Sequence, residues 1–431
     1  MLVMRLLLSL VALLVLSSCS DPAGQKKAGE ASVIRMWVAP NPAEERFWTI
    51  AVERWNKLGK GTPVAFTTIP ATGGSEEAIL TALVSGSGPD ISTNIFPGFA
   101  VQLANLGQLQ DISAMPGFEQ IKAQRQMAQI LEDARIDGHQ YVMPMYYTPI
   151  LIWWRADLLR ELGFKTPPRT FEEVYELSRR RAALNGGLGM QVLAGREWRS
   201  RWFDYVAYFY ACSDGAPYIS HERHARYDSP AGVAALSFIE TMFRNRWTAL
   251  SVEADDPLPT GVVVGAAHGA WDISYYAQNH PETLKQIVIG PMLRDAAGLK
   301  PGDKTHTFAD AKGMVLFKSS RMQAEALAFM AWVFADEELS LLWFKETGMP
   351  PARGDLMTNP RFADFFRDNP LAAQYAAYVD VARPSAHLEE TIDINKIMVQ
   401  MVDGVLFDAR PVPVAAAEAA HDTDQLLKRS Q

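Results

Sequence analysis

The sequence predicts an α/β fold with a parallel sheet, and the order of segments in its first hundred residues carries that prediction. Short runs of β-branched and aromatic residues at 32–38, 64–69 and 90–95 are typical of buried strands. Between them, 43–58 and 76–84 repeat apolar residues at helical spacing. Strands that alternate with helices in this way form a parallel sheet whose faces are covered by the helices.

A long apolar run at 141–154 predicts the next strand, which Pro144 and Pro149 interrupt. Successive side chains of a strand point to opposite faces, so we expect one of Trp153 and Trp154 to point inward and the other outward. The same patterns predict the remaining elements: helices at 156–162, 170–184, 202–212, 229–244 and within 321–344, and strands at 287–292 and 313–317.

Composition excludes several classes of protein. The chain has 431 residues with 41 basic and 49 acidic side chains, and this net charge of −8 argues against general nucleic-acid binding. Two cysteines are too few for a disulfide scaffold or a cysteine-built zinc site. No common nucleotide-binding, zinc-protease or serine-hydrolase motif is present, so we expect no catalytic residue, cofactor or metal. The 11 Trp, 13 Tyr and 20 Phe exceed what a core needs.

The N-terminus has the pattern of a secretory signal. Arg5 precedes an apolar stretch at 6–16, which is too short to anchor the chain in a bilayer. The following Ser17-Ser18-Cys19 resembles the lipobox of bacterial lipoproteins. We therefore predict a signal peptide at 1–18, lipidation of Cys19 and a flexible tether at 19–31, which would hold the protein to a bacterial membrane outside the cytoplasm. A plain secretory signal with an accidental cysteine is the alternative.

Six short motifs occur in the order that is characteristic of one family. They are Gly88-Pro89-Asp90-Ile91, Leu106-Gly107-Gln108-Leu109, the segment 138–144 (GHQYVMP), 153–158 (WWRADL), 167–173 (PPRTFEE) and 265–271 (GAAHGAW). In these motifs the chain resembles the extracellular solute-binding proteins of ABC importers, family 1, the maltose-binding-protein-like group. The resemblance runs from about residue 33 to residue 427.

The resemblance implies a two-lobed periplasmic-binding-protein fold of type II, with the ligand cleft between lobes joined by hinge crossings. The N-terminal lobe would comprise 32–144 and 305–347, and the C-terminal lobe 145–304 and 348–431. The implied protein is a monomer that binds a small-molecule ligand, most simply a sugar, and docks on the membrane permease of an ABC importer.

Position by position, the resemblance also implies a set of ligand-binding residues. Tyr205 matches a stacking aromatic position, for which Trp202 is an alternative, and Trp37 is equally compatible with the core. Many sugar binders have an acid where Thr148 stands, and Asp310 stands in a segment where the family usually has a glycine pair. The full expected set is Trp37, Glu45, Asn94, Tyr146, Thr148, Trp202, Tyr205, Trp271, Asp310 and Arg353.

Aromatic rings match the apolar face of a pyranose, and acids, amides and arginines match its hydroxyl rim, so the expected ligand is an oligosaccharide or a glycoside. Two alternatives stay open. One is a binder of a non-sugar solute such as a glycerol phosphate or a polyamine. The other is an extracytoplasmic carbohydrate-active enzyme, which would need two carboxylates facing each other across the cleft.

Overall fold

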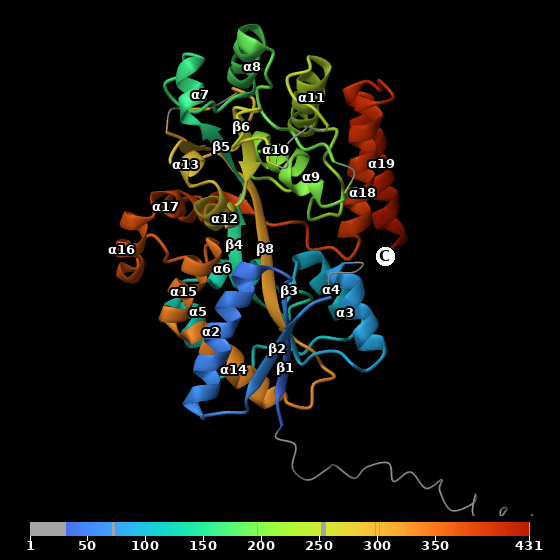
Figure 1. Cartoon of the computed structure of the whole chain (residues 1–431). Coiled ribbons are helices and arrows are strands. Elements are labelled where there is room, and N and C mark those ends of the chain that lie inside the picture. Colours follow the sequence, from blue (N-terminus) through green and yellow to red (C-terminus); the bar gives the residue numbers. More distant parts are fainter. Residues whose placement is uncertain are drawn as a thin grey trace, which may run out of the picture. The chain divides into compact units, whose positions relative to one another are not determined.

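Two β-sheets with helices packed around them form the body of the chain, as Figure 1 shows. The structure is a computed structural model, and it describes residues 32–70, 74–195, 197–250, 256–297, 299–300 and 302–430. The predicted signal peptide (1–18), lipidation site Cys19 and all of the predicted tether (19–31) therefore lie outside the described residues.

The first sheet contains the three parallel strands that the sequence predicts, but it is mixed. Parallel pairing joins the first three strands, whereas the later two run antiparallel to their neighbours. In spatial order the strands are β2 (Val64–Thr68), β1 (Ile34–Val38), β3 (Ile91–Ile95), β8 (Thr307–Leu316) and β4 (Val142–Pro149), and β9 (Ala382–Arg383) pairs in parallel with β8.

The second sheet is antiparallel and has the order β6 (Gly265–His268), β5 (Leu151–Arg155) and β7 (Ile287–Gly290). Its central strand carries Trp153 and Trp154, which are both fully buried. The expectation that one of them points outward is wrong, because helices and loops cover both faces of this short sheet. A Cβ on Gly265 would lie 2.3 Å from a ring atom of Trp154, so the glycine makes room for that indole.

The two sheets meet where the predicted strand 141–154 divides. β4 ends at Pro149 and β5 begins at Leu151, and the intervening Ile150 donates its N–H to the carbonyl of Phe308 on β8. A register shift between Pro144 and Tyr146 also bends β4. β4 and β8 lie side by side and run from the first sheet toward the second (Figure 1). This pair of strands is thus a double connection between the lobes.

The helices around the first sheet begin and end at residues with good capping chemistry. The Asn41 side chain accepts from two backbone N–H groups at the start of α2, and Gly59 ends that helix with a left-handed conformation. These helices are α2 (Pro42–Leu58), α3 (Ser75–Val84), α4 (Pro97–Asn105), α5 (Phe118–Gln124), α6 (Ala128–Asp133), α14 (Gln323–Ala335) and α15 (Glu337–Thr347).

The second lobe is mostly helical. Thr170 and Glu173 form a capping box at the start of α8. The helix predicted at 202–212 is two helices, because Asp204 interrupts it and accepts from the N–H of Tyr205. The helices are α7 (Ala156–Glu161), α8 (Phe171–Asn185), α9 (Ser200–Phe203), α10 (Tyr205–Cys212), α11 (Pro230–Arg244), α12 (Trp271–Asn279) and α13 (Pro281–Leu284).

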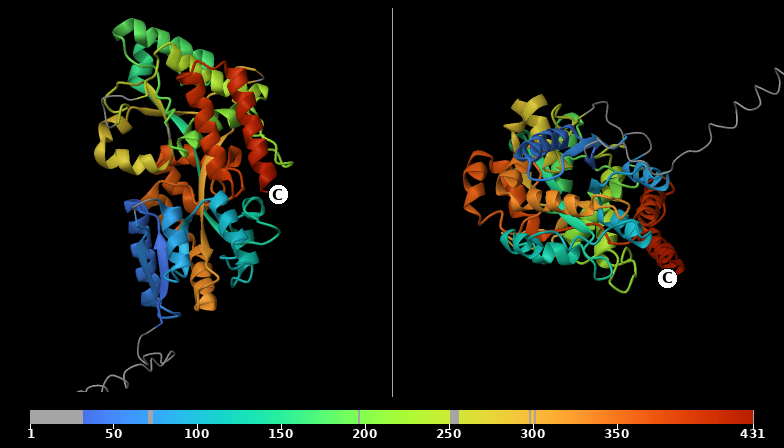
Figure 2. Two further views of the ribbon diagram at one scale, coloured as in Figure 1. Left: turned by 90° about the vertical axis from the view of Figure 1, so that its right-hand side faces the viewer. Right: turned by 90° about the horizontal axis from the view of Figure 1, so that it is seen from below.

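The C-terminal quarter of the chain contacts both lobes. α16 (Pro360–Asp368) packs on α15, and α17 (Pro370–Ala377) leads to a short 3₁₀ turn at Val379–Val381. α18 (Thr391–Leu406) and α19 (Val412–Arg429) lie side by side against α11, as Figures 1 and 2 show. α18 also meets α4 closely, since a Cβ on Gly98 would lie 2.4 Å from the Thr391 hydroxyl oxygen.

Within the described part of the chain, none of the helices combines the length and the apolar character needed to cross a bilayer. The lobe boundaries drawn from the sequence stay a prediction, and β4 runs across the one placed between residues 144 and 145.

Candidate functional site

A cleft of about 330 Å³ opens where the carboxyl ends of β1 and β3, the middle of β4 and β8, and the loop around α9 come together. This volume lies in the range of small-molecule sites. Its lining divides into an aromatic side and a polar floor. The aromatic side consists of Phe96, Tyr146, Trp198, Trp202, Phe203 and Trp271.

The aromatic side chains hold one another in place. Trp202 stacks on Phe308 with ring centroids 5.6 Å apart, and it meets Trp198 edge to face at 5.2 Å. Phe96, at the end of β3, contacts both tryptophans across the cleft, with centroid distances of 5.9 and 5.5 Å. Flat apolar faces are therefore presented from both lobes.

Trp271 is held by the backbone beneath it. It is the first residue of α12, directly after β6, and a Cβ on Gly269 would lie 2.2 Å from an atom of its ring. Such an approach is possible only for glycine, so the ring lies over bare backbone. Phe203 contacts the same indole edge to face at 6.1 Å. The position of this ring is thus set by its neighbours.

The polar floor consists of two separate sets of hydrogen bonds, made by side chains of β3, β4 and β8 and by Ser75 at the start of α3. The Tyr146 hydroxyl donates to Asp310 Oδ2 at 3.1 Å. Lys312 Nζ donates to Asn94 Oδ1 at 2.7 Å, and Asn94 Nδ2 donates to the Ser75 hydroxyl at 2.9 Å. Burial raises the pKa of Asp310, an effect that the charge of Lys312 and the Tyr146 hydrogen bond oppose.

Glu44 adds a buried acid to this floor. It lies in the first turn of α2, its residue surface is 4% exposed, and it lines the cleft. Among the described residues its carboxylate has no hydrogen bond and no ion pair. Burial raises the pKa of Glu44 to about 7; Lys312 lowers it and Asp310 raises it further. Desolvation of the charged form is the largest cause.

Half of the expected ligand-binding residues are brought together here. They come from five different segments of the chain, the strands β3, β4 and β8 and the helices α9 and α12, which meet around one cavity. The residues that line the cleft are Asn94, Tyr146, Trp202, Trp271 and Asp310.

Four expected residues lie elsewhere in the lobes. Glu45 is half-buried beside Glu44 and does not line the cleft. Trp37 is half-buried on β1 and packs against an apolar cluster of the lobe. Thr148 is fully buried on β4, opposite Asp310. Tyr205 is fully buried because the break at Asp204 directs α10 into the core, where Tyr205 contacts Tyr227 at 6.1 Å.

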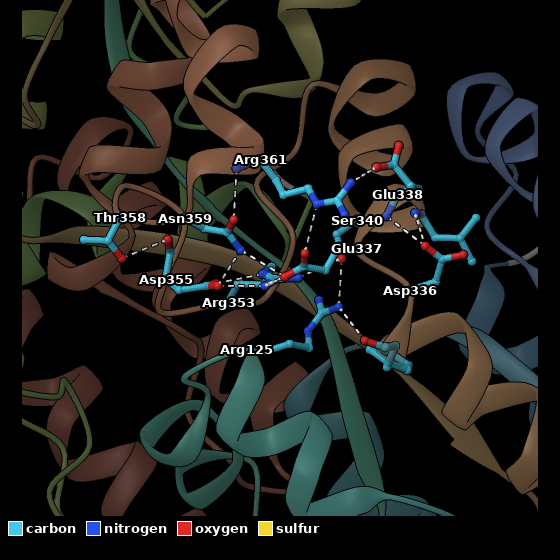
Figure 3. Close-up of polar contacts among 12 residues, drawn as sticks. Arg125, Asp336, Glu337, Glu338, Ser340, Arg353, Asp355, Thr358, Asn359 and Arg361 are labelled. Atoms are coloured by element: carbon cyan, nitrogen blue, oxygen red, sulfur yellow. Dashed lines mark hydrogen bonds and ion pairs between the residues drawn. The ribbon is translucent and has the colours of Figure 1, made fainter.

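Arg353 belongs to a separate network, which Figure 3 shows between α15, α16 and the loop that joins them. It is buried and donates to both carboxylate oxygens of Asp355 at 2.7 Å, and also to Ser340 and Glu337. It does not line the cleft. The structure therefore places Arg353 away from the cleft, with its guanidinium engaged by the carboxylates of Asp355 and Glu337.

Arg125 extends that network to α5. It is buried, and it donates to the Ser340 hydroxyl (Figure 3). It also donates to the carbonyls of Phe334 and Ala352. Burial, with a smaller effect of the neighbouring Arg353 charge, lowers the pKa of Arg125 to about 9. The two arginines therefore join α5, α15 and the 352–355 loop.

Among the lining residues that sequence reasoning missed are Glu44, Phe96, Trp198, Phe203 and Lys312. A signal existed for two of them. Glu44 falls on the same helical stripe as Phe47, Trp48 and Ala51, so its burial could be read from spacing. Phe96 directly follows a strand whose carboxyl end faces the cleft. Trp198 lies just before α9 and Phe203 is its last residue, and no sequence pattern marks the start of that short helix.

The chain matches the family model for the bacterial extracellular solute-binding protein over residues 39–339. This match covers well over half of the chain. The chain belongs to the bacterial extracellular solute-binding proteins. The family resemblance drawn from the motifs is thereby confirmed, and membership implies a place outside the cytoplasm.

Solved structures of relatives agree with this solute-binding fold. An uncharacterized protein from Listeria monocytogenes EGD-e is 26% identical, with a TM-score of 0.79 over 92% of this chain and 99% of that one. The cyclic alpha-maltosyl-1,6-maltose binding protein from Arthrobacter globiformis is 17% identical, with a TM-score of 0.76 over 92% and 99%.

The sugar-binding protein MalE from Xanthomonas citri is likewise 17% identical, with a TM-score of 0.75 over 93% of this chain and 98% of that one. At such identities the second and third likenesses show the fold alone. The two-lobed α/β fold expected for this solute-binding protein is confirmed.

Proposed function

We propose that this protein is the substrate-binding protein of an ABC importer, that it binds a sugar in the cleft, and that it delivers the sugar to a membrane permease. The observation that carries this proposal is the cleft lining, in which six aromatic rings face a hydrogen-bonded floor. A pyranose has one apolar face and a rim of hydroxyls, and it needs both kinds of surface.

The division of the lining supports a stacked oligosaccharide or glycoside. The half-buried Trp271 offers its ring from the second lobe beside the buried Trp202. Asn94, Asp310 and Lys312 offer donors and acceptors from the first lobe. A sugar that touches both sets bridges the lobes, so its binding energy favours the closed arrangement over the open one. The β4–β8 pair, with its break at Ile150, is the natural hinge.

Names of the structural relatives point in the same direction. The Xanthomonas citri protein is described as sugar-binding, and the Arthrobacter globiformis protein as binding a cyclic maltosyl-maltose. The GacH receptor of Streptomyces glaucescens, 18% identical with a TM-score of 0.75, was crystallised with acarbose. Shared fold at this identity does not transfer a ligand, but it makes a sugar panel the rational first screen.

Membrane attachment is part of the same proposal and rests on sequence. Lipidation of Cys19, a tether at 19–31 and a monomeric body would keep the binding protein near its permease while the lobes open and close. Mass spectrometry of the membrane-extracted protein should find a diacylglyceryl or triacyl group on Cys19. An unmodified chain cleaved elsewhere in the N-terminal region would support the plain secretory signal instead.

A thermal-shift screen against mono- and oligosaccharides tests the sugar assignment. A ligand present at one hundred times its Kd stabilises a protein by about 2.7 kcal/mol, which moves the melting temperature by several degrees. At least one sugar should produce such a shift together with a change in tryptophan fluorescence. A broad panel that changes neither quantity would contradict sugar binding.

Enzymatic use of the cleft is the alternative that the buried acids raise. Glu44 and Asp310 both lie in the cleft, and burial raises the pKa of each. However, α2 and β8 belong to the same lobe, so the two carboxylates lie on one side of the cavity and do not flank a ligand as glycosidase acids do. Measured turnover of any glycoside would overturn this view.

A further inference from the structure

The charges of the described residues that line the cleft are unbalanced. These residues include three acids, Glu44, Glu76 and Asp310, and the described part of the floor offers one cation, Lys312. A site that closes over its ligand excludes water, and an excess of buried negative charge then becomes expensive unless the ligand compensates it. The lining thus carries information about the charge of the ligand.

Arg199 does not restore the balance. This second cation of the lining pairs with Glu197, with 3.1 Å between Arg199 Nη2 and Glu197 Oε2, and its guanidinium lies over the Trp198 ring at 5.9 Å. Both partners belong to its own loop. Its charge is therefore compensated at the rim of the cleft, and the carboxylates of the floor still outnumber the cations.

Lys312 is also engaged. Its Nζ donates to Asn94 Oδ1 at 2.7 Å, and it lies within 4 Å of no carboxylate among the described residues. The lysine lowers the energy of the ionised acids at a distance, but it hydrogen-bonds to neither of them. Asp310 has one direct partner, the Tyr146 hydroxyl.

Glu44 is the buried acid of the cleft floor that has no hydrogen-bonding partner among the described residues. Only 4% of the surface of this residue is exposed, and it lines the cavity. No described residue donates a hydrogen bond to its carboxylate. A carboxylate that has no protein donor and borders a cavity takes its hydrogen bonds from whatever fills the cavity, which is water in the free protein and a polar group of the ligand in the complex. The cavity is therefore where a donor to Glu44 would lie.

We propose that the ligand carries a basic amine, and that this ammonium group binds between Glu44 and Asp310. The ligand class is then an amino-substituted sugar or glycoside, whose ring stacks on the tryptophans while its ammonium donates to the two carboxylates. This inference rests on the proposed sugar-binding function and narrows it.

A hydroxyl would satisfy the hydrogen-bonding capacity of Glu44 but would leave the net charge of the floor unchanged. An ammonium does both, since its three N–H groups form charge-assisted hydrogen bonds and its charge offsets one carboxylate. Anionic sugars, such as sugar phosphates and uronic acids, would add to the excess negative charge. The cleft should therefore rank amino sugars above neutral sugars, and neutral sugars above anionic ones.

Matched probe pairs test this ranking by calorimetric titration at neutral pH. Suitable pairs are glucosamine with glucose, galactosamine with galactose, and the β-1,4-linked glucosamine disaccharide with cellobiose. If the wild-type protein binds one of these pairs, the amino sugar should have a Kd about tenfold lower than the neutral sugar of the same pair. This difference corresponds to about 1.4 kcal/mol. Equal affinities, or a tighter neutral member, would overturn the proposal.

Glu44→Gln removes the charge but keeps the size of the side chain, and it should bring the affinity ratio within a pair close to one. Glu53→Gln is the matched control, because Glu53 is an exposed acid on the same helix. It should leave the ratio unchanged. Asp310→Asn is a second test variant if Glu44→Gln fails to fold, as judged by circular dichroism. A preference that survives both cleft variants would overturn the proposal.

The outcomes separate this inference from the function on which it rests. Binding of neutral sugars without any gain for amines overturns the amine subsite and leaves sugar binding intact. The protein could instead bind spermidine and no sugar, and lose the spermidine in Glu44→Gln. That result supports the cation-binding subsite and overturns the proposal that the ligand is a sugar. Absence of any response to neutral sugars, amino sugars and spermidine overturns both.

Discussion

The cleft floor and the Arg353 network both bury charged side chains, and they differ in whether those side chains have hydrogen-bonding partners in the protein. In the network, Arg353 donates to both oxygens of Asp355, and Arg125 donates to two backbone carbonyls (Figure 3). In the cleft, Glu44 is as deeply buried as these residues but has no donor among the described residues. Both clusters lie beside helices of the same lobe.

This difference distinguishes buried charges that stabilise the fold from buried charges that are available to a ligand. A buried ion pair with satisfied partners stabilises one arrangement of the chain, and removing one member leaves an uncompensated charge. A buried acid that faces a cavity costs stability in the free protein when it is ionised, and a ligand that donates a hydrogen bond to it offsets that cost. We therefore expect substitutions in the network to change stability, and substitutions in the cleft to change binding.

The largest effect should come from Arg353→Met. The methionine fills similar space but leaves Asp355 buried beside Asn359 without its arginine, so the free energy of unfolding should fall by about 3–5 kcal/mol. Urea denaturation measures this loss, and titration of the folded variant should give an unchanged Kd for the sugar that stabilises the wild type. A higher Kd with unchanged stability would instead indicate that Arg353 contacts the ligand.

The pH dependence of stability should reveal the unpaired acid. The pKa of Glu44 is about 7 in the folded protein and ordinarily 4.5, so between these values the folded protein retains a proton that the unfolded chain has lost. Stability from this group is therefore fully present below pH 4.5 and decreases as the pH rises to about 7. The difference corresponds to about 3 kcal/mol.

Glu44→Gln should remove that part of the pH dependence, and above pH 7 the variant should be more stable than the wild type. Lys312, Asp310 and Tyr146 are the charged or titratable groups that act on Glu44 or adjoin it in the floor, and they remain in both proteins. Urea denaturation at several pH values compares the two curves. Parallel curves across this range would show that Glu44 titrates normally and is accessible to water.

Removal of the stacking ring should act on binding. Trp271→Ala is expected to weaken sugar binding by roughly 1–3 kcal/mol, by analogy with the loss of aromatic stacking in other ligand sites. Trp332→Ala is the control. The Trp332 indole, on α14, packs on Trp55 and Phe329 and does not line the cleft. It should change stability and leave Kd unchanged. Equal Kd values for the Trp271 variant and the wild type would place Trp271 in the core.

The smallest effect should come from Gly269→Ala. The added methyl group would lie 2.2 Å from the Trp271 ring, which must then move away. Sugar binding should weaken by less than in Trp271→Ala, and in the double variant the glycine change should have no further effect. Calorimetric titration of the three variants measures this coupling. Additive losses would show that Gly269 acts independently of the ring.

The alternation of the first three strands with helices, and the positions where those strands end, could be predicted from sequence because both depend on local patterns. Asn94 and Trp271 lie in or directly after strands β3 and β6, whose motifs mark them, and the structure places both in the cleft. The parallel β1–β3 arrangement follows from short connections through helices. The antiparallel return of β8 was not predictable, because its partners lie more than 150 residues earlier in the chain.

Side chains whose environment depends on distant segments were harder to place. Tyr205 has helical spacing from Phe209, but the break at Asp204 turns it into the core. Arg353 was expected in the cleft from its place in the sequence, and its contacts with Ser340 and Glu337 form only in the folded chain. Each of these differences has the same physical origin, which is a contact between segments that sequence spacing does not encode.

A crystal structure of the protein with the panel sugar that raises its melting temperature most would test the central claim directly. We predict that the sugar ring stacks on Trp271 or Trp202, and that a polar group of the ligand lies within hydrogen-bonding distance of the Glu44 carboxylate. A ligand bound outside this cleft, or inside it with Glu44 still unpaired and no ring stacked on either tryptophan, would contradict the account.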